Sequence, residues 1–306
     1  MVYKNIQGRL GNQMFQYAAA KAIMKKNNIL GPINCCFKDV YKKNFKNELQ
    51  EFHLKNYCEV PKIKLYFFQK LVFIFIKLYE FFLSKLYDDS NYEIKRNKFE
   101  KKYFNLFKIF GIIRITDGYQ KIDNLNNKKN YIISGGLESP KYFDDIRNDL
   151  LEEFTPRHKR LKSNSKLYEI IEKTNSVCIS IRRGDFLNSE FKNKHFICDI
   201  DYFKKAIKIM NKKIIDPIYI VFSDDIEWCK ENLNFIPNAY FESGTDPVWE
   251  KLRLMYLCKN FIISNSTFSW WAQYLSRNSQ KIVIAPAKWK NYGIYEDIYE
   301  DFFIKI

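Results

Sequence analysis

The sequence of 306 residues predicts an α/β protein, chiefly because apolar runs of strand length alternate with helical patterns through its second half. The predicted strands cover 177–182, 218–223, 261–264 and 281–285, and the helical patterns between them include 201–212 and 248–258. Strands separated by helix-length segments predict a parallel, doubly wound sheet. The length allows two domains, which we place at residues 1–155 and 156–306, with a polar linker near 152–165.

The N-terminal domain opens with a predicted short strand over residues 2–6. The turn sequence GRLGNQMFQY follows from Gly8 to Tyr17 and leads into Ala18–Ile23, which has strong helix propensity. Glycine permits positive φ and close approach of the backbone, and the amides of a helix N-terminus attract anions. This strand, turn and helix start therefore form a first candidate for binding a charged small molecule.

From about residue 30 to residue 62 the pattern is irregular, and the next predicted element is an aromatic, apolar helix over 63–86. At about 100° per residue its polar positions share one narrow stripe: Gln69, Lys70, Lys77, Glu80 and Ser84. The far side is apolar: Phe68, Leu71, Phe75, Leu78 and Phe82. A helix buried in the N-terminal domain is the favoured interpretation, and a helix resting on a membrane surface is the alternative.

The remainder of the N-terminal domain offers weaker signals. Residues 87–130 are rich in Lys and Asn, which predicts loops and short elements around a strand at 112–115. A further strand is predicted at 131–134, and it ends at Gly135 and Gly136. These strands supply the rest of a sheet for the first domain.

An arginine pair follows the first strand of the second domain. The apolar run Val177–Ile179 leads into Ser180-Ile181-Arg182-Arg183-Gly184-Asp185. Arginine presents five donors in a planar fork and stays charged, so it suits bidentate recognition of phosphate. Ligands of open α/β sheets usually bind at strand ends. For this hexapeptide alone, a surface arginine pair beside a glycine turn is the favoured interpretation.

Two further strands of the second domain also end in polar residues. Asp224 and Asp225 follow the strand at 218–222, and SNSTFSWW follows the strand Phe261–Ile263. Hydroxyl and amide side chains at that place could cap the next helix or could join the helix amides in a phosphate cradle. The N-terminal turn, the arginine pair and SNSTFSWW are three such elements at strand ends of one chain, and together they favour an enzyme that grips the phosphates of a small molecule.

Composition narrows the class of protein. A hydrophobic fraction of 46% with 17% aromatic residues excludes disorder. The net charge is +16, and residues 38–108 hold 16 Lys and Arg against 9 Asp and Glu. Because no nucleic-acid-binding motif accompanies this charge, we expect an anionic membrane surface or a phosphorylated lipid-linked acceptor as the partner, not a nucleic acid.

Cysteine and histidine usage bears on metals and on the compartment. The seven cysteines are scattered without a Cys-x-x-Cys pair, and only three histidines are present, so a zinc site is not expected. Cys178 and Cys258 stand in or beside apolar runs and are predicted to be buried thiols in a reducing compartment. The chain opens on MVYKNIQG without a signal peptide. We therefore expect a cytoplasmic protein, soluble or peripheral on the cytoplasmic membrane.

Four stretches together resemble one known family: GRLGNQMFQYAAA, SIRRGD, FSDDIEWCKENL and CKNFIISNSTFSWWAQYL. They are similar to family 11 glycosyltransferases, the α-1,2-fucosyltransferases, and most of all to the bacterial ones. The resemblance implies a GT-B fold, in which two Rossmann-like domains enclose a cleft, with 1–155 on the acceptor side and 156–306 binding the GDP-sugar. The implied reaction moves L-fucose from GDP-β-L-fucose to a galactose 2-hydroxyl of an O-antigen or similar glycan, with inversion and without metal or other cofactor.

The resemblance also implies roles for individual residues. Arg182 and Arg183 would hold the diphosphate and neutralise the charge that grows as GDP departs. Asp185 would fix these arginines or contact the donor, and Asn12 would face the donor from the N-terminal domain. These four residues are the predicted catalytic set.

Substrate contacts are implied at seven further positions. They are Gly11 and Gln13 in the N-terminal turn, Asp224 and Asp225 near the ribose or guanine, Ser266 and Thr267 on phosphate oxygens, and Asn265 ordering their loop. Asp224 and Asp225 could also bind magnesium, but a strand-end or nucleotide role is preferred and no metal ligand is assigned.

The sequence departs from the family pattern at two positions. Ser180 stands where the family has histidine, and Lys251, beside Glu250, stands where it has aspartate. Three carboxylates could supply the catalytic base: Asp185, Asp246 and Glu250. The three histidines, His53, His158 and His195, lie outside the motifs and are taken as incidental. A related GDP-deoxysugar such as colitose is one alternative donor, and an inactive sugar-nucleotide or membrane-surface binding protein is an alternative function.

Overall fold

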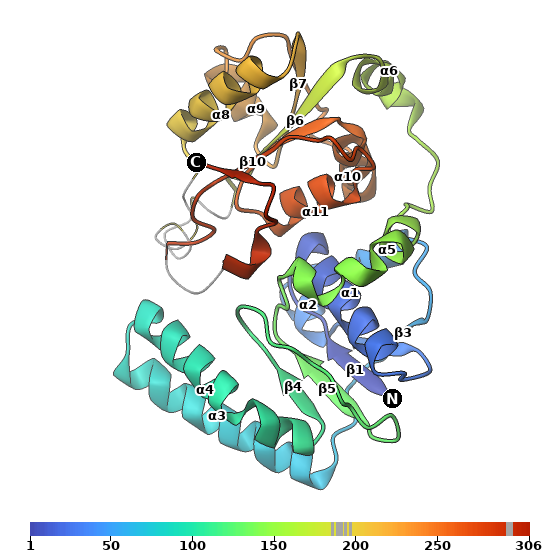
Figure 1. Cartoon of the computed structure of the whole chain (residues 1–306), viewed down its shortest axis with the longest axis vertical. Coiled ribbons are helices and arrows are strands. Elements are labelled where there is room, and N and C mark those ends of the chain that lie inside the picture. Colours follow the sequence, from blue (N-terminus) through green and yellow to red (C-terminus); the bar gives the residue numbers. More distant parts are fainter. Residues whose placement is uncertain (185–186, 188–191, 193–194, 196–197, 292–295) are drawn as a thin grey trace. The chain divides into compact units, whose positions relative to one another are not determined.

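The computed structural model describes residues 1–184, 187, 192, 195, 198–291 and 296–306. The chain forms two compact units, each a parallel β-sheet with helices (Figure 1). The first unit contains Met1–Gln50, Leu54–Glu153 and Tyr292–Tyr299, and the second contains Glu51–His53, Phe154–Asn291 and Glu300–Ile306. The predicted α/β class with two Rossmann-like halves is confirmed. The described residues 296–299, which the sequence predicts to lie in the C-terminal domain, belong to the first unit.

The sheet of the first unit has the order β3-β2-β1-β5-β4, and every pairing is parallel. Its strands are β1 (Val2–Asn5), β2 (Ile33–Cys36), β3 (Tyr57–Glu59), β4 (Ile112–Arg114) and β5 (Tyr131–Ser134). Its helices are α1 (Leu10–Lys26), α2 (Lys38–Lys42), α3 (Phe67–Leu86), α4 (Asp89–Ile109) and α5 (Arg147–Glu153). The prediction of an irregular segment from residue 30 to residue 62 is wrong, because β2 and β3 lie within it. Each has only three or four residues, too few to show periodicity.

The N-terminal turn is shorter than its sequence indicates. Gly8 has a φ of 77°, and a Cβ there would lie 2.5 Å from Asn12 Nδ2, so this position requires glycine. The helix α1 starts at Leu10. Gly11, Asn12 and Gln13 therefore stand in the first turn of a helix and not in a glycine loop.

The prediction of loops over 87–130 is wrong, because α4 occupies 21 of these residues. Phe99, Tyr103 and Phe107 recur every fourth residue, and they pack with Ile76 of α3 and Ile112 of β4. The many lysines and asparagines of α4 hide this spacing in the composition. α3 and α4 lie side by side next to β4 (Figure 1).

The helix predicted over 63–86 is present as α3, but the favoured burial in the domain is wrong. Only Gln69, Ile76 and Leu83 of α3 are buried, while its opposite side is exposed; Phe82, for example, is 60% exposed. Across the described part of the chain, no helix combines the length and the apolar content needed to cross a bilayer.

The second unit contains a parallel six-stranded sheet with the order β11-β10-β9-β6-β7-β8. Its strands are β6 (Asn175–Ile181), β7 (Pro217–Ser223), β8 (Ala239–Phe241), β9 (Asn260–Ile263), β10 (Val283–Ala285) and β11 (Ile304–Lys305). The four predicted strands are confirmed, whereas β8 and β11, of three and two residues, were not predicted. The first and fourth strands, β6 and β9, are neighbours, which is the switch point of a doubly wound sheet.

Helices connect these strands, as the alternation predicts. They are α6 (Ser165–Lys173), α8 (Ile200–Lys213), α9 (Ile226–Asn232), α10 (Val248–Leu257) and α11 (Thr267–Leu275). Short 3₁₀ turns are η1 (Leu49–Glu51), η2 (Pro140–Tyr142), η3 (Asp144–Ile146), η4 (Lys162–Asn164) and η6 (Glu296–Ile298). α11 is aromatic and enclosed, because Trp270, Trp271 and Tyr274 are each at most 1% exposed.

The seven cysteines are free thiols, of which Cys58 is exposed and the other six are buried. Burial raises the pKa of Cys35 and of Cys198 to about 12. The predicted burial of Cys178 and Cys258 is confirmed, at 0% and 1% exposed. The thiols of Cys35 and Cys198 are therefore protonated, unreactive parts of the core.

Candidate functional site

Three polar motifs that are distant in sequence meet at the carboxyl ends of neighbouring strands in the second sheet. β6 pairs with β9 on one side and with β7 on the other, and all three run in the same direction. The arginine pair follows β6, the aspartate pair follows β7, and Ser264–Ser266 follow β9. These carboxyl ends flank the switch point, where ligands of doubly wound sheets bind.

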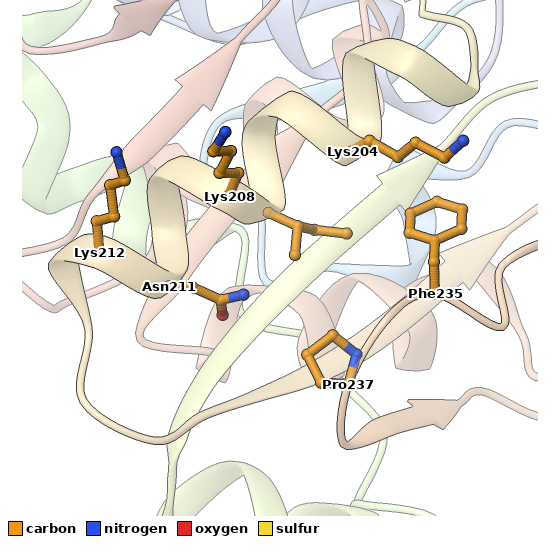
Figure 2. A pocket seen from close by; sticks show the side chains of 7 residues that line it. Lys204, Lys208, Asn211, Lys212, Phe235 and Pro237 are labelled. Atoms are coloured by element: carbon orange, nitrogen blue, oxygen red, sulfur yellow. The ribbon is translucent and has the colours of Figure 1, made fainter.

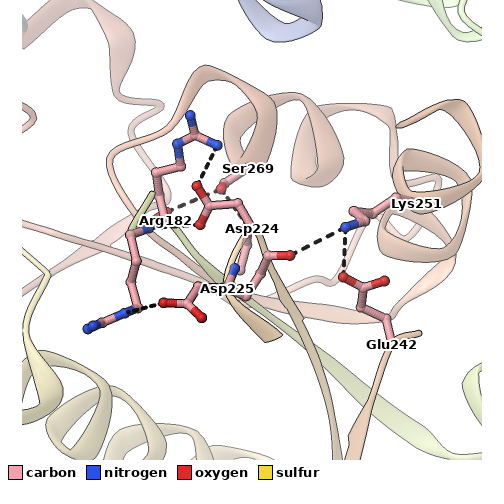
Figure 3. A network of polar contacts seen from close by, with 10 residues as sticks. Arg182, Asp224, Asp225, Glu242, Lys251 and Ser269 are labelled. Carbon is pink, nitrogen blue, oxygen red and sulfur yellow. Dashed lines mark hydrogen bonds and ion pairs between the residues drawn. The ribbon is translucent and has the colours of Figure 1, made fainter. Parts of the chain in front are cut away.

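Asp224 holds the first arginine and the backbone of the second. Arg182 Nη1 lies 2.8 Å from Asp224 Oδ2 (Figure 3), and the backbone N–H of Arg183 donates to Asp224 Oδ1 at 2.9 Å. The side chains of Arg182 and Asp224 are 18% and 23% exposed. The pair is therefore partly screened from water and fixed in position, yet accessible to a ligand.

The second arginine is fixed on two sides. Arg183 Nε donates to Asp225 Oδ2 at 3.3 Å, and its guanidinium carbon lies 3.3 Å from the centroid of the Trp228 ring. Asp225 itself caps α9 by accepting from the Trp228 N–H at 3.4 Å. The plane of this guanidinium is thus set by one carboxylate and one aromatic face.

These contacts change the roles that the sequence indicates for the aspartates. Asp224 and Asp225, predicted to lie at the ribose or guanine, pair with the two arginines. The predicted partner of the arginines, Asp185, lies outside the described residues. The pairing joins positions about forty residues apart, so no local motif could reveal it.

Gly184 makes the approach of Asp224 possible. A Cβ at Gly184 would lie 2.4 Å from Asp224 Oδ2, closer than any non-bonded contact allows. The glycine after the arginine pair therefore makes room for the carboxylate that holds Arg182. This role differs from the turn glycine at Gly8, because Gly184 needs space and not a positive φ.

A third ion pair extends the network. Lys251 Nζ lies 2.7 Å from Oε1 of Glu242, whose side chain is 0% exposed, and 3.3 Å from the carbonyl oxygen of Ser223 at the end of β7 (Figure 3). The ammonium thus compensates a fully buried carboxylate. Sequence reasoning missed Glu242, which follows β8 without any motif. The three pairs bring three positive and three negative side chains to these strand ends.

The start of α11 carries the predicted hydroxyl cradle. Ser266 stands at the N-cap position, half-buried, but its hydroxyl makes no capping hydrogen bond to the helix. Thr267 is the first helical residue and is also half-buried. Asn265 is 4% exposed, and its Nδ2 donates to the carbonyl oxygens of His195 and Trp289 at 2.9 Å each. Asn265 therefore orders the loop, and capping by Ser266 does not explain the motif.

A buried serine cluster joins β6 to α11. Ser180 Oγ lies 2.6 Å from Ser269 Oγ, and Ser264 Oγ lies 3.3 Å from the same atom. The three side chains are at most 6% exposed. Ser180, at the position where the resemblance implies a histidine, is thus a structural hydroxyl that fixes α11 beside β6.

The candidate catalytic bases differ in burial and in hydrogen bonding. Glu250 is 0% exposed; Oε1 accepts from Leu161 N, Asn164 Nδ2 and Tyr168 Oη, and Oε2 accepts from Arg253. Its lone pairs are used inside the protein, which makes Glu250 structural. Asp246 is half-buried and accepts from Asn164 Nδ2 at 3.0 Å. Of the three histidines, His158 stacks on Trp249 and contacts Glu51.

The predicted residues of the first unit stand at the start of α1. Gln13 is 0% exposed. Its Nε2 donates to the carbonyl oxygens of Gly8 and Lys46, and its Oε1 accepts from the Glu48 N–H. Gln13 is therefore a structural tie between two loops and not the predicted substrate contact. Gly11 is buried and Asn12 is half-buried, with Asn12 packed against Gly8.

Hollows on the described part of the second unit include two that are lined partly by charged side chains. One borders the arginine site and is lined by Arg183, Trp228, Phe203 and Asp199 among others. The other runs along α8, where the side chains of Lys204, Lys208, Asn211, Lys212, Phe235 and Pro237 surround it (Figure 2). All polar side chains of the α8 hollow are exposed, so it lacks the buried polar group of a built anion site. Among the described residues, no group of three or more His, Cys, Asp or Glu is placed to hold a metal ion.

Comparison with known proteins identifies the family. Residues 1–304 match the family model described as Glycosyl transferase family 11. Relatives include the O-antigen biosynthesis glycosyltransferase WbnK of Escherichia coli, 28% identical over 94% of both chains. An alpha-1,2-colitosyltransferase of Escherichia coli is 29% identical over 94% of this chain and 92% of its own. Human galactoside alpha-(1,2)-fucosyltransferase 1 is 28% identical over 47% of this chain and 42% of its own.

Among solved structures, NodZ alpha-1,6-fucosyltransferase soaked with GDP-fucose is similar over 89% of this chain and 92% of its own. Its sequence identity is 10% and its TM-score is 0.48, a likeness too distant to support an argument. The family match spans nearly the whole chain and confirms the resemblance drawn from the four motifs. The chain belongs to glycosyltransferase family 11.

Proposed function

We propose that this glycosyltransferase moves L-fucose from GDP-β-L-fucose to the 2-hydroxyl of a galactose in a bacterial surface glycan, with inversion at the anomeric carbon. The observation that carries the proposal is the arginine pair after β6, held by Asp224 and Asp225 at the switch point of the sheet. Two fixed guanidinium groups at that place suit a nucleoside diphosphate-sugar.

Arg182 and Arg183 stabilise the leaving diphosphate in this mechanism. Breaking the glycosidic bond adds negative charge to GDP, and fixed donors aimed at that charge lower the barrier. A guanidinium carries five N–H donors, so an arginine held by one carboxylate can also bind phosphate oxygens. Asp224 and Asp225 act as positioning residues, because they orient the two forks before the donor arrives.

The start of α11 assists the arginines. Ser266 and Thr267 are half-buried where β9 gives way to the helix, and the amides of a helix N-terminus favour an anion. The hydroxyls of both residues donate to phosphate oxygens in this proposal. Charge on the diphosphate is then met by side chains and amides, so the reaction proceeds without a metal ion or other cofactor.

The base that takes the proton from the acceptor hydroxyl comes from a short set of carboxylates. Asp246 remains a candidate because it is half-buried with one hydrogen bond from Asn164. Asp185, outside the described residues, is the other candidate. Glu250 is removed from the set by its buried hydrogen bonds. Asn12 stays in the proposal as a residue of the first unit that contacts the donor.

The acceptor in this proposal is a lipid-linked glycan at the cytoplasmic face of the membrane. Two observations support it: a relative that is named for O-antigen biosynthesis, and a net charge of +16 that suits a phosphorylated lipid or an anionic surface. The enzyme would accordingly work in the cytoplasm, against the membrane.

Colitose is the second candidate sugar. A relative named as an alpha-1,2-colitosyltransferase is 29% identical over 94% of this chain. The two GDP-sugars present the same diphosphate, so the arginine site fits either donor. The enzyme would discriminate strongly between the two donors only if its sugar pocket forms a hydrogen bond to the fucose hydroxyl that colitose lacks.

A panel of GDP-sugars with galactose-terminated acceptors tests the proposal. We expect transfer from GDP-fucose, with kcat/KM above that for GDP-colitose, and a product linked to the galactose 2-hydroxyl in the α configuration. A higher kcat/KM for GDP-colitose would establish the second candidate. Binding of GDP-sugars without turnover of any of them would favour an inactive binding protein, and the absence of both binding and turnover would refute a GDP-sugar enzyme.

A further inference from the structure

The transfer reaction leaves the exposed apolar side of α3 unexplained. Nine large apolar side chains, each 47% to 71% exposed, form what we call the aromatic stripe: Phe67, Phe68, Leu71, Ile74, Phe75, Leu78, Phe81, Phe82 and Leu86. At 100° per residue they span about 140° of the helix surface. Apolar residues so placed form one continuous face, which marks an interaction surface.

The stripe is not the core-facing side of a misplaced helix, because the opposite side of α3 is already packed. Ile76 and Leu83 are 1% and 4% exposed. Tyr79 stacks on Phe99 of α4 with ring centroids 3.9 Å apart, and Gln69 Nε2 donates to the carbonyl oxygen of Phe110. The first unit therefore completes its core without the stripe.

Positive charge surrounds the stripe. Between residues 62 and 87 the chain has five lysines, Lys62, Lys64, Lys70, Lys77 and Lys85, all exposed. The single acidic residue of this segment, Glu80, forms an ion pair with Arg114. Lys85 Nζ lies 5.7 Å from the Phe81 ring centroid, and lysine stems can lie along apolar surface while the ammonium reaches headgroups.

An anionic lipid surface matches this combination better than a second copy of the chain does. An apolar helical face edged by lysines lies in the plane of the interface, with its rings among the acyl chains and its ammonium groups near lipid phosphates. Two copies that paired their stripes would bring two sets of five lysines together, and the one acidic residue between positions 62 and 87, Glu80, is already paired with Arg114. Charge complementarity therefore selects the membrane.

We infer that the aromatic stripe of α3 is the surface by which the enzyme rests on an anionic membrane. The contact depends on both properties of the face: apolar side chains that enter the interface, and lysines that attract anionic headgroups. It concerns binding alone and does not depend on which sugar is transferred.

Vesicle sedimentation tests the inference directly. We expect the full chain to sediment with vesicles of equal parts phosphatidylcholine and phosphatidylglycerol at about 0.1 M salt, and far less with phosphatidylcholine alone. Raising the salt to about 1 M shortens the Debye length from about 10 Å to about 3 Å and should weaken binding. Protein that stays in the supernatant with anionic vesicles at low salt would overturn the inference.

Matched variants assign the contact to the stripe. We expect Leu71→Gln/Leu78→Gln/Phe82→Gln to weaken the vesicle partition coefficient at least about tenfold. Leu30→Gln/Ile215→Gln, which replaces exposed apolar side chains by Gln away from the stripe, at sites 90% and 80% exposed, should leave it unchanged. Equal loss in both variants, or no loss in either, would contradict the assignment.

A second pair of variants isolates the charge contribution. We expect Lys70→Glu/Lys77→Glu to weaken the partition coefficient about tenfold, and Lys204→Glu/Lys208→Glu in the α8 hollow (Figure 2) to have little effect. All four variants should retain transfer to a soluble galactose-terminated oligosaccharide, which separates this test from that of the reaction. A stripe-dependent dimer in sedimentation velocity without lipid would replace the membrane by a second copy.

Discussion

In both units polar side chains lie where strands end near the switch point of the sheet, but the side chains differ in charge. In the second unit, charged side chains pair with one another after β6, β7 and β8. In the first unit, buried neutral amides and one lysine satisfy the backbone after β1. Gln16 donates to the Gln7 carbonyl oxygen and accepts from its N–H, and Lys4 Nζ donates to the carbonyl oxygens of Asn5 and Gly135.

Under the proposed function, this difference assigns diphosphate binding to the second unit and structural support to the first. The Arg182–Asp224 and Arg183–Asp225 pairs are partly exposed to water and contribute little to stability, but they fix two guanidinium groups in positions that suit an anionic ligand. Buried amides that satisfy loop backbone contribute to stability and cannot turn outward without loss. Substitutions of the paired arginines should therefore lower activity, and substitutions of Lys4 and of the buried amides should lower stability.

The largest effect is expected at Arg183. We predict that Arg183→Ala lowers kcat/KM at least about a hundredfold, as the loss of one charge-stabilising donor does in other enzymes, and that Arg183→Lys fails largely as well because lysine lacks the fork. The unfolding free energy should fall by only about 1 kcal/mol or less. Steady-state transfer assays and urea unfolding measure the two quantities.

The matched control is Arg160→Ala, since Arg160 also lies in the second unit in an ion pair, with Glu172, and is 49% exposed. It should change neither kcat/KM nor stability appreciably. Near-normal kcat/KM in Arg183→Ala, or an equal loss in Arg160→Ala, would remove the arginine site from the mechanism.

The next effect is expected at the turn of the first unit. Gly8→Ala places a Cβ 2.5 Å from Asn12 Nδ2 at a φ of 77°, so we predict a loss of about 1–3 kcal/mol in unfolding free energy. Gly31, with φ 104° and open space around it, is the control, because Gly31→Ala adds the backbone strain without the collision. An equal loss of unfolding free energy in both variants would mean that the Asn12 side chain moves away from the new Cβ at no cost.

A pH dependence of stability should distinguish the first unit through Lys4. Burial lowers the pKa of Lys4 from 10.5 to about 7. Between these values the unfolded chain binds more protons than the folded one, so stability rises with pH, by about 1.4 kcal/mol per unit for one full proton. The measurement is urea unfolding of the wild type and of Lys4→Met between pH 7 and 9, taking the difference between the two proteins.

The pH range of the measurement ends at 9 because of Cys35. Burial raises the pKa of Cys35 from 9.0 to about 12, so above pH 9 this thiol makes stability fall with pH, opposite to the effect of Lys4. A difference that does not change with pH across this range would mean that Lys4 keeps its charge when buried.

The smallest effect is expected from chelation. If two arginines, two hydroxyls and the amides of α11 meet the charge of the diphosphate, transfer should proceed unchanged in excess chelator. The check is the initial rate with chelator, without it, and with magnesium added back. Loss of the rate with recovery in magnesium would reassign Asp224 and Asp225 from arginine partners to metal ligands.

Sequence reasoning succeeded where a signal is local. β6 and β7 are seven-residue strands, and the arginine pair directly follows one of them, so pattern and motif agree. Sequence reasoning failed where an element is very short or where its structure depends on long-range contacts. β8 and β11 are too short to predict, and the lysines of α4 obscured the apolar spacing at Phe99 and Phe107.

The candidate site shows the same limit. The position of Arg182 and Arg183 directly after a strand could be predicted from the sequence, and the structure confirms it. Their pairing with Asp224 and Asp225, and that of Lys251 with Glu242, arises from the register of β6, β7 and β8, which the sheet alone establishes. The sequence thus predicted where the arginines lie, whereas their partners could be identified only from the topology.

The distribution of thiols has a practical consequence for following this enzyme in solution. Cys58 lies exposed on β3, an edge strand of the first sheet, while the other six cysteines are enclosed. A maleimide fluorophore should therefore attach at one position of the native wild-type chain, with no cysteine removed. Fluorescence from that label would report when the first unit meets a nucleotide or a vesicle.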